Sequence, residues 1–414
     1  MSLRAPKGTD DILPPASRTW RRLLRAWDLL TERYGFDYVA TPIFEATEVF
    51  ARGVGESTEV VEKQMYTFED KAGRMLTLRP ENTAGVVRAY LQSGRSGVFK
   101  GAYSGPCFRY ERPQAGRRRQ FWQLGVEYLG TDEIEADLEV IEVGYQFLRE
   151  AGLSDLELQI NSIGDGPDRV RFNEVLVEWL TARRDQLSVD SQRRIATNPL
   201  RVLDSKSDAE IMEESPTPLE FLSPAAAAHY EALKAGLVER EITFREAPRL
   251  VRGLDYYNRT VFEYVPRSYE AAQSAVGGGG RYDGLSELLG GPALPGVGLA
   301  LGFDRILLAL GDRPPARALD VFLVVADPDR RSEAWAFARR LRDAGIRCDL
   351  LAGERSVKAQ FKAADRRDAA AAVVIGQEWD QGMVTVKDLS SGEEFKLAAG
   401  DLPSWVRGTR GAET

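Results

Sequence analysis

The sequence predicts an α+β core, in which helices flank a mainly antiparallel sheet, together with a helical insertion and a C-terminal α/β domain. Three observations lead to this fold class. Hairpin-like pairs of strands alternate with periodic helices up to residue 160. Polar and alanine-rich sequence over 168–247 is typical of helices, and strand-rich sequence resumes only at 250–264. Beyond residue 318, apolar strands and helices alternate regularly, as they do in small α/β domains.

These changes in texture divide the chain, whose 414 residues suit two or three domains. The sequence Arg-Pro-Pro-Ala-Arg at 313–317 is typical of a linker and marks the start of the last domain. We expect a first part of the core at 1–167, the insertion at 168–247, a second part of the core at 248–312, a linker at 313–318 and the C-terminal domain at 319–414.

The first part of the core opens with a helix at 18–34, where tryptophan and leucine recur at helical spacing and Gly35 ends the run. Residues 36–40 alternate as in a strand and run into Pro42. The elements expected after it are hairpin strands at 64–69 and 74–78, a helix at 81–91, strands at 99–112 and 119–129 around a loop at 113–118, an acidic helix at 133–149 and a strand at 156–160.

In the second part of the core, the strand at 250–264 is followed by four glycines at 277–280, a small-residue strand from Gly296 and a helix at 303–310. The C-terminal domain has short apolar runs separated by periodic polar stretches, which predicts strands alternating with helices. We expect strands at 320–326, 346–351 and 371–375, helices at 331–344 and 356–367, and a last strand at 383–389 near the edge of the sheet.

The composition excludes several kinds of site and location. The chain has one histidine, His229, and two cysteines, Cys107 and Cys348, so a Cys/His zinc site lacks its fourth ligand and a disulfide framework is ruled out. His229 lies in an alanine-rich helical stretch, which argues against catalysis by a Ser-His or Cys-His pair. No segment approaches the ~20 apolar residues of a membrane span, and the N-terminus lacks the apolar region of a signal peptide. The chain, with a net charge of −8, is expected to be soluble and cytoplasmic.

The densest chemical signal lies in the hairpin, where arginine occupies five positions between 109 and 119 of an otherwise acidic chain. Arginine binds phosphate through planar, bidentate hydrogen bonds. Arg109 follows an apolar strand, so we expect it to lie over the sheet, and Glu111 shares its face. The hairpin suits a triphosphate or the end of a nucleic acid, and the alternative is a solvated charged loop.

Three further segments carry polar groups or glycines within apolar sequence. Residues 250–263 place Arg252 and two tyrosines in a strand that begins and ends apolar, which suits a pocket wall or an edge strand. The glycines at 277–280 permit positive φ angles or a close approach of a ligand to the backbone. The strand at 296–302 leads into a helix that bears Arg305, which suits a purine beside a phosphate or simply tight packing.

Taken together and in this order, the segments resemble a class II aminoacyl-tRNA synthetase. Pro42 and Phe44 resemble the first motif of that class, which builds the dimer interface. Residues 108–127 resemble the second motif, and residues 298–305 resemble the third.

Two signatures make the resemblance more specific. Arg-Gly-Leu-Asp-Tyr-Tyr at 252–257 and Gly-Gly-Gly-Arg-Tyr-Asp at 278–283 are similar to sequences peculiar to histidyl-tRNA synthetases. Residues 77–81 and 198–204 also match that family. The resemblance therefore covers essentially the whole chain.

The resemblance implies the class II fold for a catalytic core and an anticodon-binding role for residues 319–414. It also implies ligation in two steps: L-histidine and ATP give histidyl-adenylate and pyrophosphate, and histidine then passes to the 3′-terminal adenosine of tRNA(His). Chemistry at a phosphate depends on positioning and charge neutralisation, which arginine and Mg²⁺ supply. The implied partners are L-histidine, ATP with Mg²⁺, tRNA(His) and a second copy in a homodimer, with no membrane and no metal site fixed by protein residues.

Residue roles follow from the matched motif positions. Arg109 and Arg252 are implied to be catalytic, one on each side of the α-phosphate. Within the histidine site we expect Glu81 at the α-ammonium and Glu127 or Tyr257 towards the imidazole, although Glu81 at a helix start also suits simple capping. The ATP site is implied to comprise Arg109, Glu111, Arg117 and Arg305, the histidine site Glu81, Thr83, Arg109, Gln123, Glu127, Arg252, Tyr256, Tyr257 and Tyr282, and the site for the tRNA acceptor end Gln114 and Arg118.

Two alternatives stay open beside the ligase. One is a non-catalytic, synthetase-like regulatory subunit of ATP phosphoribosyltransferase in histidine biosynthesis. Such subunits generally lack the C-terminal domain and have degraded histidine and ATP signatures, whereas residues 318–414, the 252–257 signature and the five hairpin arginines are all present here. The other alternative is a class II enzyme for another amino acid.

Overall fold

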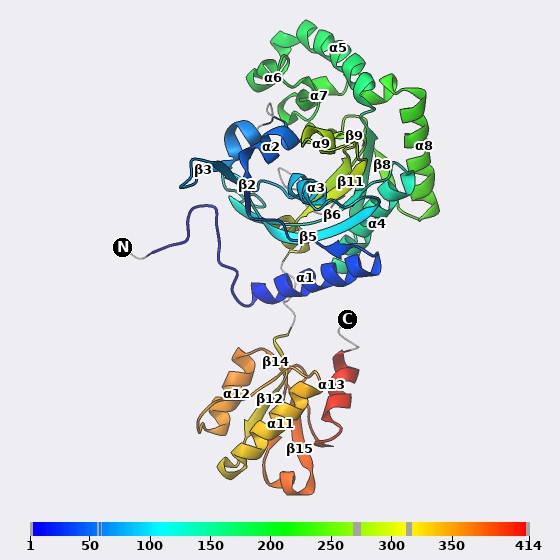
Figure 1. Ribbon diagram of the computed structural model, residues 1–414. Coiled ribbons are helices and arrows are strands. Elements are labelled where there is room, and N and C mark those ends of the chain that lie inside the picture. The colour runs from blue at the N-terminus through cyan, green and yellow to red at the C-terminus, as the bar shows by residue number, and fades with distance from the viewer. Residues whose placement is uncertain (1–2, 56–57, 59, 268–274, 312–316, 411–414) are drawn as a thin grey trace. The chain divides into compact units, whose positions relative to one another are not determined.

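The computed structural model describes residues 3–55, 58, 60–267, 275–311 and 317–410 (Figure 1). The chain forms two compact units, one of Met1–Ile12 with Leu23–Arg313 and the other of Leu13–Arg22 with Pro314–Thr414. Most of the predicted linker at 313–318 lies outside the described residues. None of the helices in the described part of the chain has the length and apolarity that a bilayer span requires.

The larger unit is built on a mixed sheet that has eight strands within its described residues, in the order β1-β5-β6-β11-β10-β9-β7-β8. Neighbouring strands pair antiparallel except β1 with β5 and β7 with β8. The predicted α+β core with a mainly antiparallel sheet is confirmed. The strands are β1 (Asp37–Tyr38), β5 (Phe99–Phe108), β6 (Gln120–Leu129), β7 (Leu156–Ser162), β8 (Phe244–Glu246), β9 (Asn258–Pro266), β10 (Gly277–Arg281) and β11 (Gly296–Gly302).

Helices pack against this sheet through apolar faces. Trp27 of α1 is buried, its ring meets Phe147 of α4 edge-on at 5.1 Å, and its Nε1 donates to the carbonyl of Tyr103 at 3.2 Å. Helix α4 packs against β6, β7, β9 and β11. The helices of this unit outside the insertion are α1 (Ala16–Arg33), α2 (Thr47–Val54), α3 (Thr83–Gln92), α4 (Ile134–Ala151), α9 (Leu285–Leu288) and α10 (Phe303–Leu310).

A second, smaller sheet joins β2 (Phe44–Ala46), β4 (Met75–Leu78) and β3 (Tyr66–Glu69) in antiparallel order. The predicted hairpin at 64–69 and 74–78 corresponds to β3 and β4. The hairpin loop is closed by Asp70, whose carboxylate accepts hydrogen bonds from the backbone N–H of Ala72 at 2.8 Å and of Arg74 at 3.0 Å. Such Asx turns are a common reason for aspartate in tight loops.

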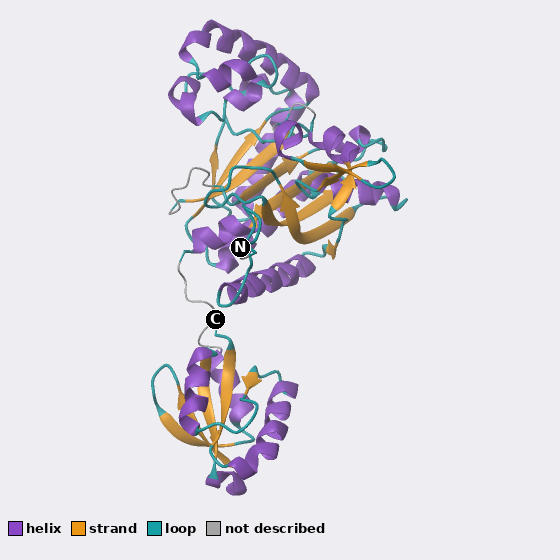
Figure 2. Cartoon of the chain, turned by 90° about the vertical axis from the view of Figure 1, so that its left-hand side faces the viewer, coloured by secondary structure: helices purple, strands orange, loops and turns teal. Residues whose placement is uncertain are grey.

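The insertion is helical, as the polar and alanine-rich sequence predicts. Most of its helices gather beyond one end of the main sheet (Figure 2), whereas its last helix, Pro224–Glu239, packs against α4, β7 and β9. The buried residues of the insertion, among them Phe172, Leu176 and Met212, belong to an apolar cluster that continues into the main unit through residues such as Val261 and Tyr282. The chain returns to the main sheet through β8, which pairs with β7. The helices are α5 (Gly166–Ala182), α6 (Val189–Arg194), α7 (Ala209–Met212) and α8 (Pro224–Glu239).

The smaller unit has a sheet in the order β13-β12-β14-β15-β16, covered by helices, so the predicted C-terminal α/β fold is confirmed. The expected strand at 383–389 is β15 and lies next to the edge, as predicted, but it is not the last strand, because β16 pairs outside it. Only two of the five residues of β16 are exposed, and sequence analysis did not identify this short strand. The elements are β12 (Leu319–Val325), α11 (Arg331–Asp343), β13 (Cys348–Asp349), α12 (Val357–Arg366), β14 (Ala369–Ile375), β15 (Met383–Asp388), β16 (Glu394–Ala398) and α13 (Leu402–Arg410).

The expected strand at 250–264 is only half correct. Strand β9 begins at Asn258, and residues 250–257 form a loop instead. Their backbone groups bond outside the sheet: the N–H of Leu250 donates to the carbonyl of Ala247 at 2.8 Å, and that of Asp255 to the carbonyl of Val54 at 3.2 Å. The apolar residues that suggested a strand are used in packing the loop onto the insertion.

The glycines at 277–280 form most of β10, in the middle of the main sheet. Positive φ angles do not explain them, because their backbone is extended. A Cβ atom at Gly279 would overlap the carbonyl of Gly298 on β11, and one at Gly280 would overlap the carbonyl of Thr260 on β9. Glycine is needed here because neighbouring strands approach too closely for a side chain.

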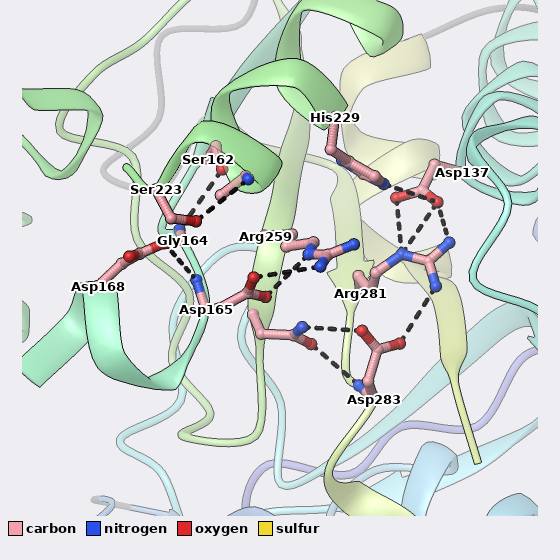
Figure 3. Close-up of polar contacts among 12 residues, drawn as sticks. Asp137, Ser162, Gly164, Asp165, Asp168, Ser223, His229, Arg259, Arg281 and Asp283 are labelled. Carbon is pink, nitrogen blue, oxygen red and sulfur yellow. Dashed lines mark hydrogen bonds and ion pairs between the residues drawn. The ribbon is translucent and has the colours of Figure 1, made fainter. Parts of the chain in front are cut away.

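A fully buried ion pair joins β10 to α4 behind this strand (Figure 3). Arg281 Nε donates to the Asp137 carboxylate at 3.1 and 3.3 Å, and Arg281 Nη1 lies 3.1 Å from Asp283 Oδ1. Both side chains of the Arg281–Asp137 pair are 0% exposed. His229 of α8 lies 3.8 Å from Asp137, and burial lowers the pKa of this imidazole. His229 therefore lies in the packed interior, as its alanine-rich helix suggested.

We expect Arg281→Met to destabilise the chain by about 3–5 kcal/mol, because removal of one partner leaves a buried carboxylate uncompensated. Urea unfolding monitored by tryptophan fluorescence measures the change. Arg33→Met is the control: its exposed pair with Glu150, 3.1 Å apart, should contribute about 0.2–1 kcal/mol. An equal, small loss in both variants would contradict the assigned role of Arg281.

Candidate active site

A cavity of about 170 Å³ opens above the main sheet and brings together most of the residues predicted to act. Its walls come from the β5–β6 hairpin, the start of α3, the 252–257 loop and the β11–α10 junction. Gln114, Glu127 and Tyr282 are the predicted residues that do not line it. Those that do are Glu81, Thr83, Arg109, Glu111, Arg117, Arg118, Gln123, Arg252, Tyr256, Tyr257 and Arg305.

Arginines dominate one side of the cavity and are held in place by backbone groups. Arg109 Nε donates to the carbonyl of Pro80 at 2.9 Å, and its guanidinium lies 5.2 Å from the centre of the Phe121 ring. Arg305 Nε donates to the carbonyl of Gly116 at 3.2 Å. Burial lowers the pKa of Arg305, and the charges of Arg109 and Arg117 lower it further. Positive groups held this close together favour the binding of an anion.

The hairpin loop adds a second layer of charge. Glu111 pairs with Arg117 at 3.1 Å. Arg118 pairs with Asp10 and, at 3.3 Å, with Asp304. Gln114 is exposed at the tip, where its backbone pairs with that of Arg117 across a short turn. The hairpin is therefore a folded structure whose arginines are oriented by acidic partners, and not an unstructured charged loop.

Arg252 enters the cavity from the opposite wall, on the loop that precedes β9. It forms an ion pair with Glu263 of β9, and its guanidinium lies 6.0 Å from the ring centre of Tyr257. Gly278 provides the space, since a Cβ there would come within 3.0 Å of Arg252 Nη1. The Nε atom of Arg252 is buried without a hydrogen-bond partner, which is unusual for a charged group. This N–H is therefore able to donate to a ligand in the cavity.

The other side of the cavity is acidic and aromatic. Glu81 caps α3, because its carboxylate accepts the backbone N–H groups of Thr83 at 2.5 Å and Ala84 at 3.0 Å. Burial raises the pKa of Glu81, and these hydrogen bonds oppose the rise. Glu81 also lines the cavity, so the capping and binding interpretations are compatible.

Glu127 of β6 lies beneath this side, fully buried. Its carboxylate accepts hydrogen bonds from Thr83 Oγ1 at 2.7 Å, from the Tyr103 hydroxyl at 3.1 Å and from the Tyr282 hydroxyl. Burial raises the pKa of Glu127 to about 8, even though the three donors stabilise the charged form. Gly298 makes room for the carboxylate, because a Cβ there would overlap it.

The tyrosines form a compact cluster around the two carboxylates. The rings of Tyr256 and Tyr257 lie 4.6 Å apart, and those of Tyr256 and Tyr282 lie 5.6 Å apart in an edge-on arrangement. Burial raises the pKa of Tyr103, Tyr256 and Tyr282 well above the usual value, so their hydroxyls remain protonated donors. A polar pocket of this kind distinguishes ligands by the hydrogen bonds that they complete.

Gln123 completes this wall. Its amide oxygen accepts hydrogen bonds from Asn82 Nδ2 and from Cys107 Sγ, both at 3.2 Å. The buried thiol of Cys107 has its pKa raised to about 12, so it stays protonated. Cys107 therefore orients Gln123 rather than acting as a nucleophile.

Comparison of the sequence with known protein families gives matches along most of the chain. The sequence matches the family profile Histidyl-tRNA synthetase over residues 8–168 and 171–306, and the profile Anticodon binding domain over 320–409. The chain belongs to the histidyl-tRNA synthetase family. As a member of that family it uses ATP as a substrate.

Relatives and a solved structure support the assignment. The chain is 42% identical to the histidine–tRNA ligase of Halothermothrix orenii, covering 97% of this chain and 98% of the relative, and 44% identical to that of Synechococcus elongatus, covering 97% and 94%. The crystal structure of apo histidyl-tRNA synthetase from S. aureus superposes with a TM-score of 0.76 at 37% identity, covering 98% of this chain and 100% of that one. The class II fold predicted from the motifs is confirmed.

Sequence reasoning about this synthetase missed two residues at the site and one whole wall. Tyr103 is a buried residue of β5, whereas Glu263 is a partly buried residue of β9 that lines the cavity; each is a polar group within an apolar strand, which is the signal that could have identified them. A second, larger cavity adjoins the first and shares Arg109, Arg252 and Arg305 with it. Its outer wall comes from α2–β3 and the insertion, with Lys63, Arg193, Arg194, Asn198 and Arg201 among its residues.

The raised pKa of Glu127 predicts how Glu127→Gln changes stability with pH. Between its ordinary value of 4.5 and about 8, the carboxyl ionises in the unfolded chain but stays protonated when folded, so it destabilises the folded state as pH rises. Glutamine cannot ionise. The free energy of unfolding of Glu127→Gln should therefore rise relative to that of the wild type by at most about 1.4 kcal/mol per pH unit between pH 5 and pH 8.

Urea midpoints measured at four pH values across this range give the two stability curves. Glu214→Gln, at an exposed position of the insertion, controls for the loss of a carboxylate as such. Curves for Glu127→Gln and wild type that stay parallel over the whole range would show that Glu127 is not the buried acid described above.

Proposed function

We propose that the chain ligates L-histidine to tRNA(His): it activates histidine with ATP to histidyl-adenylate and pyrophosphate, then transfers it to the 3′-terminal adenosine. The observation that carries this proposal is a single cavity with hairpin and α10 arginines on one side, and on the other side Arg252, Glu81 and two tyrosines above the buried Glu127. The first side suits a triphosphate and the second suits an amino acid with an α-ammonium and an imidazole. The division of the chain into a catalytic core at 1–167 and 248–312, an insertion at 168–247 and an anticodon-binding domain at 319–414 belongs to the same proposal.

In the first step the histidine carboxylate attacks the α-phosphorus of ATP, and pyrophosphate leaves. Negative charge grows on the oxygens of the α-phosphate as the bond forms, and fixed cations stabilise it most when they are already in position. Arg109 is fixed by the Pro80 carbonyl and Phe121, and Arg252 by Glu263. We assign these two arginines to the α-phosphate, one from each wall of the cavity.

The remaining charged groups on the hairpin and α10 side are proposed to bind the other parts of ATP. Arg117 and Arg305 are assigned to the outer phosphates, and Glu111 orients Arg117 and can accept a hydrogen bond from the adenine amino group. Gly302 and Ala300 line the cavity where a flat base fits between β11 and the hairpin. The described residues contain no cluster of three or more His, Cys, Asp or Glu side chains that would hold a metal ion. Mg²⁺ is therefore proposed to bind with ATP, mainly through phosphate oxygens, and to supply further positive charge.

Histidine recognition is assigned to Glu81, Thr83, Gln123, Glu127 and the tyrosines at 256, 257 and 282. Glu81 opens on the cavity and is the proposed partner of the α-ammonium. Glu127 lies deeper and is connected to the cavity by the hydrogen bonds that it accepts from Thr83 and Tyr282. Its pKa of about 8 is close to neutral, so a cationic or N–H donor group of a ligand would favour its ionised form. We place the imidazole on this side, against Glu127 or Tyr257.

The second step requires the tRNA acceptor end to reach the adenylate. Gln114, at the exposed tip of the hairpin, and Arg118, on the cavity wall, are the proposed contacts. Arg118 would exchange its pairing with Asp10 for a tRNA phosphate, since Asp10 is 60% exposed and easily released. The domain that matches the anticodon-binding family at 320–409 is proposed to read the opposite end of the same tRNA.

The regulatory alternative finds less support. A regulatory subunit would need neither the ordered arginines at the α-phosphate position nor a C-terminal anticodon-binding domain. Both are present in this chain. The reaction is placed in the cytoplasm, where both buried, free cysteines, Cys107 and Cys348, would remain reduced.

A homodimer is proposed on the small sheet, beside the first class motif. Apolar side chains remain exposed there: Phe44 is 52% exposed and packs edge-on against Phe68 at 6.4 Å, and Ile43 and Met75 are exposed as well. Contiguous apolar side chains on a surface commonly mark a protein–protein interface. Because this sheet carries β4, which leads to Glu81, pairing of two copies would also support the histidine site.

Arg252→Ala should reduce histidine-dependent ATP–pyrophosphate exchange by on the order of 10²–10³, because it removes a fixed cation from the developing charge. Circular dichroism should show an intact fold. Arg245→Ala is the control, since Arg245 lies on β8 in an ordinary pair with Glu157 and should leave the exchange rate unchanged. Near-normal exchange by Arg252→Ala would refute its catalytic assignment.

Phe44→Asp should weaken or abolish the dimer, because it places a charge in the proposed interface. Sedimentation velocity at micromolar concentration measures the effect. Val238→Asp introduces the same charge at another exposed apolar position, on α8, and should leave the dimer intact. If the wild type sediments as a monomer, or if both variants remain dimeric, the interface is placed wrongly.

A further inference from the structure

The loop at 250–257 carries two tyrosines of the proposed histidine site, yet it lies outside any strand. Its fixed position must therefore come from contacts other than a ladder of sheet hydrogen bonds. Three contacts from the start of α5 and from the insertion fall on residues 255, 257 and 259, that is, on Tyr257 and on residues before and after the tyrosine pair.

The first contact is made by Arg169 in the first turn of α5. Its Nη1 atom donates to the carbonyl of Tyr257 at 2.8 Å and to that of Asp255 at 3.3 Å. Burial lowers the pKa of Arg169, and Asp255 opposes the shift. A partly buried guanidinium thus bridges the two backbone carbonyls that flank Tyr256, and it holds the turn that places both rings.

The second contact lies two residues further along, at Arg259 (Figure 3). Arg259 has φ of 46°, a left-handed conformation that residues other than glycine seldom adopt. Its guanidinium pairs with Asp165, directly before α5, at 2.8 and 3.1 Å, and its backbone N–H donates to the carbonyl of Gly164 at 2.9 Å. The strained backbone after the tyrosines is therefore stabilised by the same end of α5.

The third contact comes from Asn198, the first residue of a segment that matched the family but had no assigned role. Its side-chain amide donates to the Asp255 carboxylate at 3.2 Å. Residues 255 and 257 are thus held from the insertion, and residue 259 is held from the segment directly before it, while the rings of Tyr256 and Tyr257 contact each other, Tyr282 and Arg252.

We propose that Arg169, supported by Asp165 and Asn198, is a positioning residue for histidine recognition: the start of α5 fixes the backbone of 255–259, and so sets where Tyr256 and Tyr257 lie. The inference rests on the proposed function, because it needs a histidine site at these tyrosines. It makes the insertion part of the amino-acid site, although Arg169 and Asp165 contribute only through the loop that they hold.

The test compares Arg169→Met, Arg169→Lys and Arg171→Met in ATP–pyrophosphate exchange without tRNA. Arg169→Met should raise the KM for histidine by about tenfold or more, because small displacements of binding groups are costly, with the KM for ATP within about twofold of wild type. Arg169→Lys keeps a cationic donor near the Tyr257 carbonyl and should restore part of the loss. Arg171 lies on the same helix, is 53% exposed and pairs with Asp168, so its substitution should change neither constant.

Equal increases in both KM values for Arg169→Met, or no increase at all, would overturn the proposal, as would an Arg169→Lys variant no better than Arg169→Met. Thermal unfolding of each variant shows whether it is folded; if Arg169→Met is not, the comparison of Arg169→Lys with Arg171→Met carries the test, and a KM for histidine unchanged in Arg169→Lys then rejects the inference. Wild-type chain that shows no exchange with histidine would instead reject the proposed function.

Discussion

The buried carboxylate of Glu127 is the point on which the site depends. It accepts hydrogen bonds from hydroxyl groups on α3, on β5 and on the segment after β10, so that three parts of the core are fixed to one side chain of β6. An ionisable group is tolerated in such a place only if its hydrogen bonds are complete. The surrounding sequence follows from this need: Gly298 leaves space for the carboxylate, Gly125 leaves space for the Tyr103 hydroxyl, and the tyrosines stay protonated because they are buried.

The cavity gains its chemical character from charges that are separated before any ligand binds. Arg109 and Arg305 lie on the hairpin and α10 side, each held by a backbone carbonyl, and Arg252 lies on the opposite wall, held by Glu263, beside the carboxylates and tyrosines of the sheet, the start of α3 and the 250–257 loop. Such preorganisation avoids the cost of turning groups towards charge as it develops. It also explains how a chain with a net charge of −8 can bind a triphosphate, because positive charge is concentrated where the phosphates are proposed to bind.

Much of the fold and of the site could be predicted from sequence, for reasons that particular residues make plain. Periodicity located the long helices and hairpins, and polar residues clustered in otherwise apolar sequence drew attention to Arg109, Arg252 and Glu127. Residues 250–257 were misjudged, since alternation cannot distinguish a strand from a loop held by long-range contacts such as those of Arg169. The glycines of β10 are explained by distances between neighbouring strands, and β16 by pairing with β15; neither is encoded locally. Tyr103 lacked any signal beyond its place in an apolar strand.

The proposed site activates histidine and no other amino acid. The most direct measurement is ATP–pyrophosphate exchange by the purified wild-type chain, run separately with each of the twenty amino acids. Exchange should depend on histidine, with the other amino acids at background, because a polar site built to hydrogen-bond an imidazole rejects side chains that leave its groups unpaired. Exchange that requires a different amino acid, or an absence of exchange with histidine by folded protein, would contradict the account.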